Sequence, residues 1–253
     1  SLPSQTRAAV VAVPTEFHHQ IAMECIGRGW DVLVEKPLAA SVAQAREMVE
    51  QAKRRERVLQ AGHTERYNPA VRQALSRVTR PRFIEVHRLG TFAPRSLDVD
   101  VILDLMIHDL DIALSLDSTG VESVAAVGVN VLTDKMDIAN ARLGFRSGCV
   151  ANFTASRIST DRVRKIRIFQ SESYLSIDSA MQELVHYPLE REGGAARIVQ
   201  VPSAVEKDEP LRAELMDFVQ ALSSRRPLVS GEDGLAALEL AEKVVLAIRK
   251  GGS

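Results

Sequence analysis

The 253-residue chain has an ordinary globular composition, with 45% hydrophobic and 26% charged residues. Its 32 basic and 33 acidic residues nearly cancel, so it lacks the positive field that nucleic acid or an anionic membrane requires of a partner. Cys25 and Cys149 have no paired spacing, and neither a signal-peptide core nor eighteen consecutive apolar residues is present. We therefore expect a cytoplasmic protein with reduced thiols and no nucleic-acid or membrane partner.

The N-terminal part of the chain predicts parallel βαβ units. Short apolar runs predict three buried strands, at residues 8–13, 31–35 and 58–62. Two helices alternate with them. The first is N-capped by Thr15 and closed by Gly27 and Gly29, and the second is N-capped by Ser41, with a glutamine three residues later as in a capping box. Short connections between alternating strands and helices favour a parallel sheet.

The second predicted strand ends in the sequence Glu35-Lys36-Pro37. Proline favours an extended conformation for the residue before it and cannot continue a central ladder. The ammonium of Lys36 is thereby held at the carboxyl end of a strand, where open α/β sheets bind ligands. A surface lysine beside a turn proline is the alternative interpretation of these few residues.

Polar residues follow all three predicted strands. Thr15 and His18 follow the first strand. Glu35 and Lys36 follow the second strand, and His63 follows the third. Because the carboxyl ends of parallel strands share one edge of the sheet, these groups are expected to converge on one crevice. The alternative is that loops after buried strands are polar because they are solvated.

From Asn68 the periodicity changes. A helix through Val71 and Leu75 and an alternating strand over residues 83–89 precede residues 101–116, which are apolar on nearly every side. The latter pattern predicts a helix buried all round, with an N-cap at Asp98 to Asp100. Short β-rich segments follow at residues 121–131, 137–145, 149–158, 163–169, 174–177, 182–187 and 196–201.

Two helices close the chain. One begins at Pro210, and the other spans residues 231–250 and is capped by Gly251. The apolar stripe expected on the first of them consists of Leu211, Leu215, Phe218 and Leu222.

Within the predicted buried helix, Asp104 and His108 are four residues apart and share one face. One interpretation is a carboxylate that orients an imidazole serving as general acid and base. Another is a core histidine with a satisfied hydrogen bond. A third is a metal site that includes Asp109 and Asp111, but those two point away from the other face, so we expect no metal.

These elements predict an α/β plus α+β fold. A truncated Rossmann-type parallel sheet is followed by a large, open, mostly antiparallel β-sheet domain flanked by helices. The expected domains are residues 1–66, the C-terminal half of a dinucleotide-binding domain, and residues 67–253, a domain for substrate binding and oligomerisation. The open face of the large sheet is expected to form a homodimer or homotetramer interface.

The chain resembles the Gfo/Idh/MocA family of NAD(P)-dependent oxidoreductases. The resemblance is carried by Glu-Lys-Pro at residues 35–37, by Pro14-Thr15 with His18 before it, and by Asp-x-x-x-His at residues 104–108 ahead of a large sheet. It implies a nicotinamide cofactor, NAD or NADP. The catalytic residues that it implies are Lys36, Asp104 and His108, and the cofactor-binding residues are Pro14, Thr15, His18, Glu35, Lys36 and His63.

Residues 62–69, 98–111, 137–142 and 154–157 resemble members that oxidise the 3-hydroxyl of UDP-N-acetylglucosamine or its uronic acid. The family pattern implies that His108 or Lys36 takes the hydroxyl proton and that Lys36 stabilises the alkoxide. The substrate-binding residues expected are Lys36, Arg66, Tyr67, Asn68, Asp104, His108 and Arg157. Alternatively, Arg66 and Arg157 pair with acids of the chain itself.

The sequence departs from this family because it contains no Gly-x-Gly-x-x-Gly turn to hold a pyrophosphate. We therefore expect weak or no dinucleotide binding by these residues, and an exposed edge beside the first strand. Two other functions stay open: a non-catalytic oligomerising remnant, and a redox-assisted glycoside hydrolase of the kind known among relatives.

Overall fold

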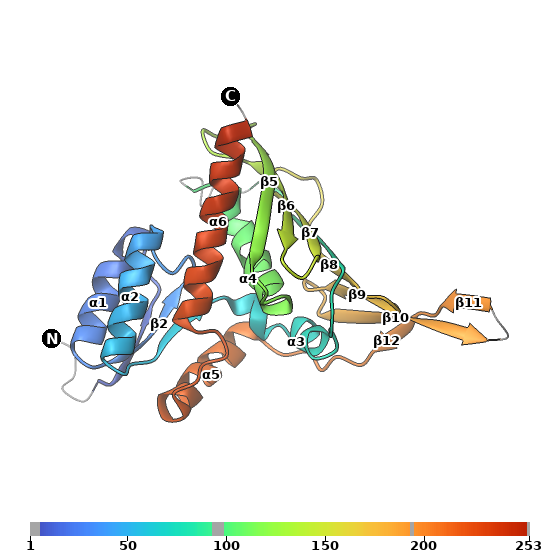
Figure 1. The fold of residues 1–253 in the computed structure, drawn as a ribbon. Helices are drawn as coiled ribbons and strands as arrows, with labels where there is room; N and C mark the ends of the chain where they lie inside the picture. The colour runs from blue at the N-terminus through green and yellow to red at the C-terminus, as the bar shows by residue number, and fades with distance from the viewer. Residues whose placement is uncertain (1–5, 93–98, 193–194, 252–253) are drawn as a thin grey trace. The chain divides into compact units, whose positions relative to one another are not determined.

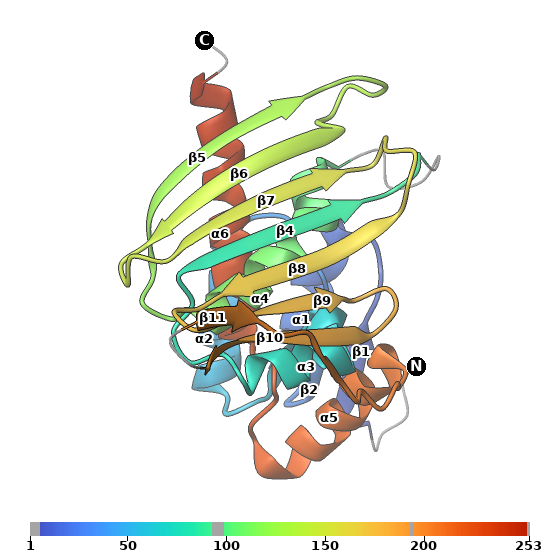
Figure 2. The ribbon, with the colours of Figure 1, turned by 90° about the vertical axis from the view of Figure 1, so that its right-hand side faces the viewer.

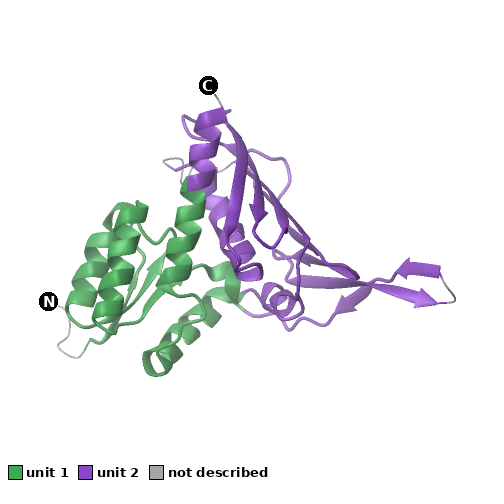
Figure 3. Cartoon of the chain, viewed as in Figure 1, with its two compact units in different colours: residues 1–67, 209–242 green, residues 68–208, 243–253 purple. Residues whose placement is uncertain are grey.

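A computed structural model of the chain describes residues 6–92, 99–192 and 195–251, which form two compact units (Figure 3). Unit 1 contains residues 1–67 and 209–242, and unit 2 contains residues 68–208 and 243–253. The segment 209–242, expected in the second domain, thus belongs to unit 1. The long C-terminal helix α6 (Gly231–Gly251) contributes its first half to unit 1 and its second half to unit 2.

Unit 1 contains the predicted three-stranded parallel sheet (Figure 1). The strands are β1 (Ala8–Val11), β2 (Asp31–Glu35) and β3 (Leu59–Gly62), with β2 in the centre. Residues 32–34 are fully buried, as the continuous apolar run predicts for a strand covered on both faces. In the part of the chain that the structure describes, β1 pairs only with β2, and its Val10 is 49% exposed, which fits the exposed edge expected there.

The helices of unit 1 confirm one predicted cap and correct the other. Helix α2 (Val42–Arg54) is N-capped by Ser41, whose Oγ accepts a hydrogen bond of 3.3 Å from the Gln44 backbone N. Thr15 is not an N-cap. It opens a 3₁₀ turn, η1 (Thr15–Phe17), in which Phe17 N donates to Pro14 O at 2.9 Å, and helix α1 (His18–Gly27) begins only after this turn.

The predicted stripe of helix α5 (Pro210–Ser224) was wrong in its N-terminal half. Leu211 and Leu215 are 46% and 38% exposed, whereas the buried face consists of Glu214, Phe218 and Ala221. The reason is tertiary packing: Phe218 and Ala221 lie against apolar side chains of β2 and the segment before β3, while Glu214 is held by a hydroxyl from the turn after β3. Apolar spacing alone could not foresee a buried carboxyl.

Unit 2 is built on one large mixed sheet, seen face-on in Figure 2. Its order is β11-β10-β9-β8-β4-β7-β6-β5, with β12 also paired to β10. All pairs are antiparallel except β4 with β7, which confirms the expected mostly antiparallel sheet. The strands are β4 (Phe83–Leu89), β5 (Val121–Val129), β6 (Ile138–Phe145), β7 (Val150–Ser156), β8 (Val163–Phe169), β9 (Ser173–Asp178), β10 (Glu183–Glu192), β11 (Ala195–Ile198) and β12 (Val201–Ser203).

One face of this sheet is covered by α3 (Pro69–Leu75), by α4 (Ile107–Leu116) and by the unit 2 half of α6, which lie behind it in Figure 2. The single helix predicted over residues 101–116 is in fact a π-helical turn, η3 (Ile102–Met106), continued by α4. It is not buried all round, because Asp104 and His108 are half-buried.

The predicted cap of that helix does not form. Asp98 lies outside the described residues, and the Asp100 carboxylate accepts from Met136 N at 3.0 Å instead of capping. The two cysteines are buried free thiols, as expected. Among the residues described, the longest and most apolar helices still fall short of what a membrane span requires.

Candidate functional site

Lys36 directly follows β2 in unit 1 and is half-buried. Its peptide bond to Pro37 is cis, and its backbone N donates to Glu35 Oε2 at 3.3 Å. The neighbouring strand passes close by: a Cβ on Gly62 would lie 3.0 Å from Glu35 Cα, so only glycine leaves β2 undisturbed there. The strand end that carries Lys36 is therefore tightly packed.

His63 and Arg66 lie near Lys36, as the convergence of strand ends predicts. His63 is 1% exposed, and burial, reinforced by the positive charges of Arg66 and Lys36, lowers its pKa to about 3. The imidazole is thus uncharged throughout the physiological pH range. A neutral ring beside two cations is suited to hydrogen bonding and not to general acid catalysis.

His18 has both ring nitrogens directed at backbone carbonyls. Nδ1 is 2.9 Å from the oxygen of Pro37, Nε2 is 2.8 Å from that of Val13, and the side chain is 1% exposed. The ring therefore links the segment after β1 to the residue next to Lys36. This geometry gives His18 a structural role, while Pro14 and Thr15 lie in and before η1, exposed and half-buried respectively.

Tyr67 and Asn68, expected at the substrate, have partners within the chain. Tyr67 OH donates to Asp217 Oδ2 at 2.8 Å, and burial with this hydrogen bond raises its pKa. Asn68 caps α3 by accepting from Ala70 N at 3.1 Å, and it donates to Ser179 O at 2.8 Å. Both side chains are buried and serve the fold.

Asp104 and His108 lie in unit 2 on one helix face, a turn apart, with both side chains half-buried. Asp109, the next residue, points the other way and forms a bidentate ion pair with Arg88 of β4, at 2.7 and 2.8 Å. Within residues 6–92, 99–192 and 195–251 no cluster of three or more potential metal-ligating side chains occurs. Asp104 and His108 are thus the partly accessible titratable groups of this helix face.

Arg157 is buried and directed into unit 2. Its Nη2 donates to Val99 O at 2.5 Å, and its Nε is 3.9 Å from Asp137 Oδ1. Burial alone would raise the pKa of Asp137, but hydrogen bonds from three backbone N–H groups and the Thr133 hydroxyl outweigh it and lower the pKa to about 2. A permanent carboxylate facing Arg157 favours the internal pairing over a diphosphate contact.

The sequence pattern did not indicate Glu214, because this residue lies among leucines in a helix. It is fully buried in unit 1, and burial together with the charge of Glu35 raises its pKa to about 7. The apolar periodicity of a helix does not mark an ionisable residue, even where tertiary packing buries it. Its i, i+4 spacing to Phe218 is the one sequence feature that could have indicated it.

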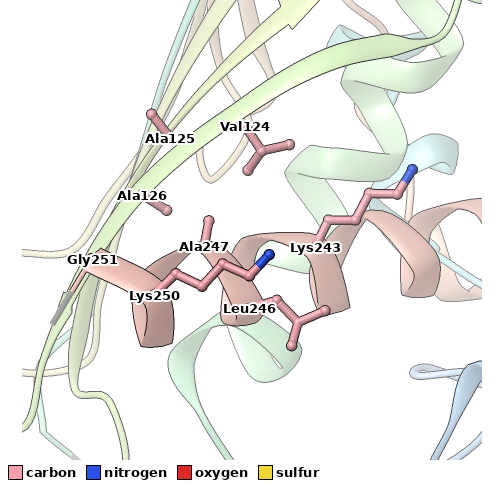
Figure 4. Close-up of a pocket in the computed structure, with 8 residues that line it drawn as sticks. All are labelled: Val124, Ala125, Ala126, Lys243, Leu246, Ala247, Lys250 and Gly251. Carbon is pink, nitrogen blue, oxygen red and sulfur yellow. The ribbon is translucent and has the colours of Figure 1, made fainter. Parts of the chain in front are cut away.

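A separate pocket of about 520 Å³ lies between β5 and the unit 2 half of α6 (Figure 4). None of the predicted site residues lines it. The lining residues are Val124, Ala125, Ala126, Lys243, Leu246, Ala247, Lys250 and Gly251.

Comparison with known proteins assigns both parts of the chain. Residues 1–63 match the oxidoreductase family with an NAD-binding Rossmann fold, and residues 70–176 match the GFO/IDH/MocA C-terminal domain. With a parallel sheet whose carboxyl edge carries Lys36, these matches define a nicotinamide-dependent oxidoreductase.

The chain is also similar to individual dehydrogenases of this class. UDP-N-acetylglucosamine 3-dehydrogenase of Acidithiobacillus ferrooxidans is 36% identical over 98% of this chain and 80% of its own length. Its solved structure matches with a TM-score of 0.91 at 34% identity, over 99% of this chain and 83% of that one. Myo-inositol 2-dehydrogenase of Thermotoga maritima is 28% identical over 92% of this chain and 75% of its own length. The chain belongs to the Gfo/Idh/MocA family of oxidoreductases.

Proposed function

We propose that the chain oxidises a secondary hydroxyl of a nucleotide sugar, with C3 of UDP-N-acetylglucosamine or its uronic acid as the first candidate. The observation that carries this proposal is Lys36, fixed at the carboxyl end of β2 beside a neutral His63, in a chain 36% identical to an enzyme of that name. Arg66 adds a second cation at the same strand ends.

The residues at the strand ends fit the nicotinamide end of the cofactor. Glu35, Lys36 and His63 offer an acceptor, a cation and an uncharged imidazole at the edge where parallel sheets bind such ligands. The pyrophosphate end has no counterpart in the 253 residues, because they contain no glycine-rich turn. When bound, the cofactor supplies the hydride acceptor, and either NAD or NADP fulfils that role.

The protein's own residues supply the proton chemistry. We assign to His108, oriented by Asp104 one turn away, the removal of the hydroxyl proton. Lys36 stabilises the developing alkoxide by its positive charge and is the second candidate base. The alcohol loses one proton and one hydride overall and becomes a ketone.

The quaternary structure belongs to the same proposal. Half-buried rings form a cross-strand ladder on the face of the sheet opposite its helices, with centroid distances of 5.7, 5.1 and 4.2 Å between Phe83, Phe169, Tyr174 and Tyr187. Such a face is suited to a homodimer or homotetramer interface. Light scattering should give a multiple of 27.8 kDa, whereas a monomer at micromolar concentration would contradict the proposal.

The function is tested by dehydrogenase assay with NAD⁺ and NADP⁺ over a panel of UDP-sugars, with myo-inositol as the matched control. Two forms are compared: the 253-residue chain, and the same chain extended upstream of Ser1 by the half of a Rossmann domain that carries the glycine-rich turn. We expect the extended form to turn over UDP-N-acetylglucosamine or its uronic acid and to bind the dinucleotide in calorimetric titration, and the 253-residue chain to do neither.

The alternatives give different results in the same assay. Release of aglycone from a glycoside with catalytic NAD would indicate redox-assisted hydrolysis. If neither form binds a dinucleotide or turns over any sugar, the chain is a non-catalytic remnant and the proposed function is wrong.

A further inference from the structure

Glu214 is a buried ionisable group that the proposed reaction does not use. It projects from helix α5 with no exposed surface, on the same face as Phe218 and Ala221. Burying a carboxyl carries a free-energy penalty that an apolar residue at this position would avoid. Packing therefore does not account for a glutamate at this position.

Two acids of α5 hold both ends of the turn that follows β3. The Thr64 hydroxyl lies 3.2 Å from each carboxyl oxygen of Glu214, and Tyr67 OH donates to Asp217 at 2.8 Å. Between these contacts, Gln60 Nε2 donates to the backbone oxygen of Glu214 at 3.2 Å and to Tyr67 OH at 3.0 Å. The turn η2 (Thr64–Tyr67) is thus fastened to α5 at its first and last residues.

The fastened turn carries part of the candidate site. Arg66 lies within η2, and His63 immediately precedes it. Both are buried, and both Arg66 and Lys36 act on the charge state of His63. The Thr64 contact of Glu214 thus lies at the start of the turn that carries Arg66, directly after His63.

The groups that shift the pKa of the Glu214 carboxyl come from three elements. Burial has the largest effect on its pKa, followed by Glu35 of β2, and both raise it; Thr64 of η2 lowers it, and Asp217 of α5 raises it. The resulting pKa is about 7, so the carboxyl gains and loses its proton near neutrality. Once ionised, it adds a second negative charge beside Glu35, whose neighbour in the chain is Lys36.

We propose that Glu214 is a positioning residue which, through Thr64 and Glu35, sets the placement and the electrostatic surroundings of the Lys36 ammonium. This inference rests on the proposed function, in which Lys36 stabilises the alkoxide. With its proton, Glu214 holds the turn without adding charge. Without its proton, it adds a negative charge to the surroundings of the Lys36 ammonium.

The kinetic test compares pH profiles of kcat/KM for the wild type, Glu214→Gln and Glu232→Gln over about pH 5.5 to 9. Glutamine keeps a partner for Thr64 but cannot ionise, and Glu232 is an exposed acid of the same unit. We expect an inflection of the profile in the neutral range to move by about one pH unit in Glu214→Gln and to keep its position in Glu232→Gln. A lower rate with an unchanged profile shape would mean that Glu214 is merely structural and would overturn the proposal.

A second test does not depend on turnover. In ¹³C NMR, the Lys36 Cε signal should follow the titration of Glu214 in the wild type and stay flat in Glu214→Gln. If Glu214→Gln does not fold, Thr64→Val should move the Glu214 titration upward, because this hydroxyl is the contact that favours the carboxylate. The proposal is overturned if the Lys36 Cε signal does not change in either variant. If the signal follows the Glu214 titration but no form of the chain turns over a sugar, only the proposed function is contradicted.

Discussion

Replacing Lys36 by methionine is expected to lower kcat/KM for the nucleotide sugar by about 10³-fold while leaving the fold intact. The side chain follows β2 and is half-buried, so methionine retains much of the packing and removes the charge that the alkoxide requires. Steady-state kinetics in the form of the chain that turns over provides the measurement.

Two controls accompany this change. Lys53→Met removes an exposed lysine from the end of α2 in the same unit, and it should leave the rate unchanged. Lys36→Arg keeps the charge on a longer, planar group and should recover part of the activity. If Lys36→Met kept the wild-type rate, Lys36 would be an ordinary lysine beside a turn proline.

Replacing Arg88 by methionine is expected to destabilise unit 2 by about 3–5 kcal/mol. The Arg88 and Asp109 side chains are only 5% and 2% exposed, so the change leaves a carboxylate buried without its bidentate partner. Denaturant unfolding followed by circular dichroism measures the loss. Because Asp109 directly follows His108, we also expect a fall in kcat from the residual folded enzyme.

The double variant Arg88→Met with Asp109→Leu should regain most of this stability, since it leaves no buried charge behind. A matched surface control is Arg197→Ala, which breaks a pair whose side chains are 67% and 46% exposed and should cost under about 0.5 kcal/mol. An equal loss in Arg88→Met and Arg197→Ala would show that burial of the first pair has no energetic consequence.

The local hydrophobic pattern and the capping residues predicted most of the fold, because each of these signals lies within a single helix or strand. The apolar run ending at Glu35 gave β2 its observed bounds, and the alternation over residues 83–89 gave β4, whose side chains are buried at every second position. Ser41 caps α2 because a side-chain oxygen three residues before a backbone N–H needs no distant partner.

The features that the sequence did not predict all depend on contacts with distant parts of the chain. Thr15 could not be recognised as part of a 3₁₀ turn, and the burial of Glu214 depends on Thr64, 150 positions earlier. Tyr67, Asn68 and Arg157 were expected at the substrate, and the structure gives each of them an internal partner that one sequence does not reveal.

The sequence predicted the part of the candidate site that the order and direction of the strands determine. Parallel strands force Glu35, Lys36 and His63 to one sheet edge whatever their side chains do. The uncharged state of His63 could not be predicted, because it arises from burial beside two cations. Family resemblance names residues, whereas burial determines which of them can exchange a proton near neutral pH.

The π-helical turn η3 sets the angular phase of the helix that continues from it. Such a turn holds one residue more than an α-helical turn, so it offsets everything downstream by about 100° about the axis. With this offset, Asp109 meets Arg88 while His108 stays half-open beside Asp104. If residues 102–106 became regular α-helix at unchanged length, both groups would turn about the helix axis by this angle, whereas deleting one residue there would leave their direction unchanged. The extra residue in η3 thus decides which α4 side chain pairs with β4 and which stays accessible.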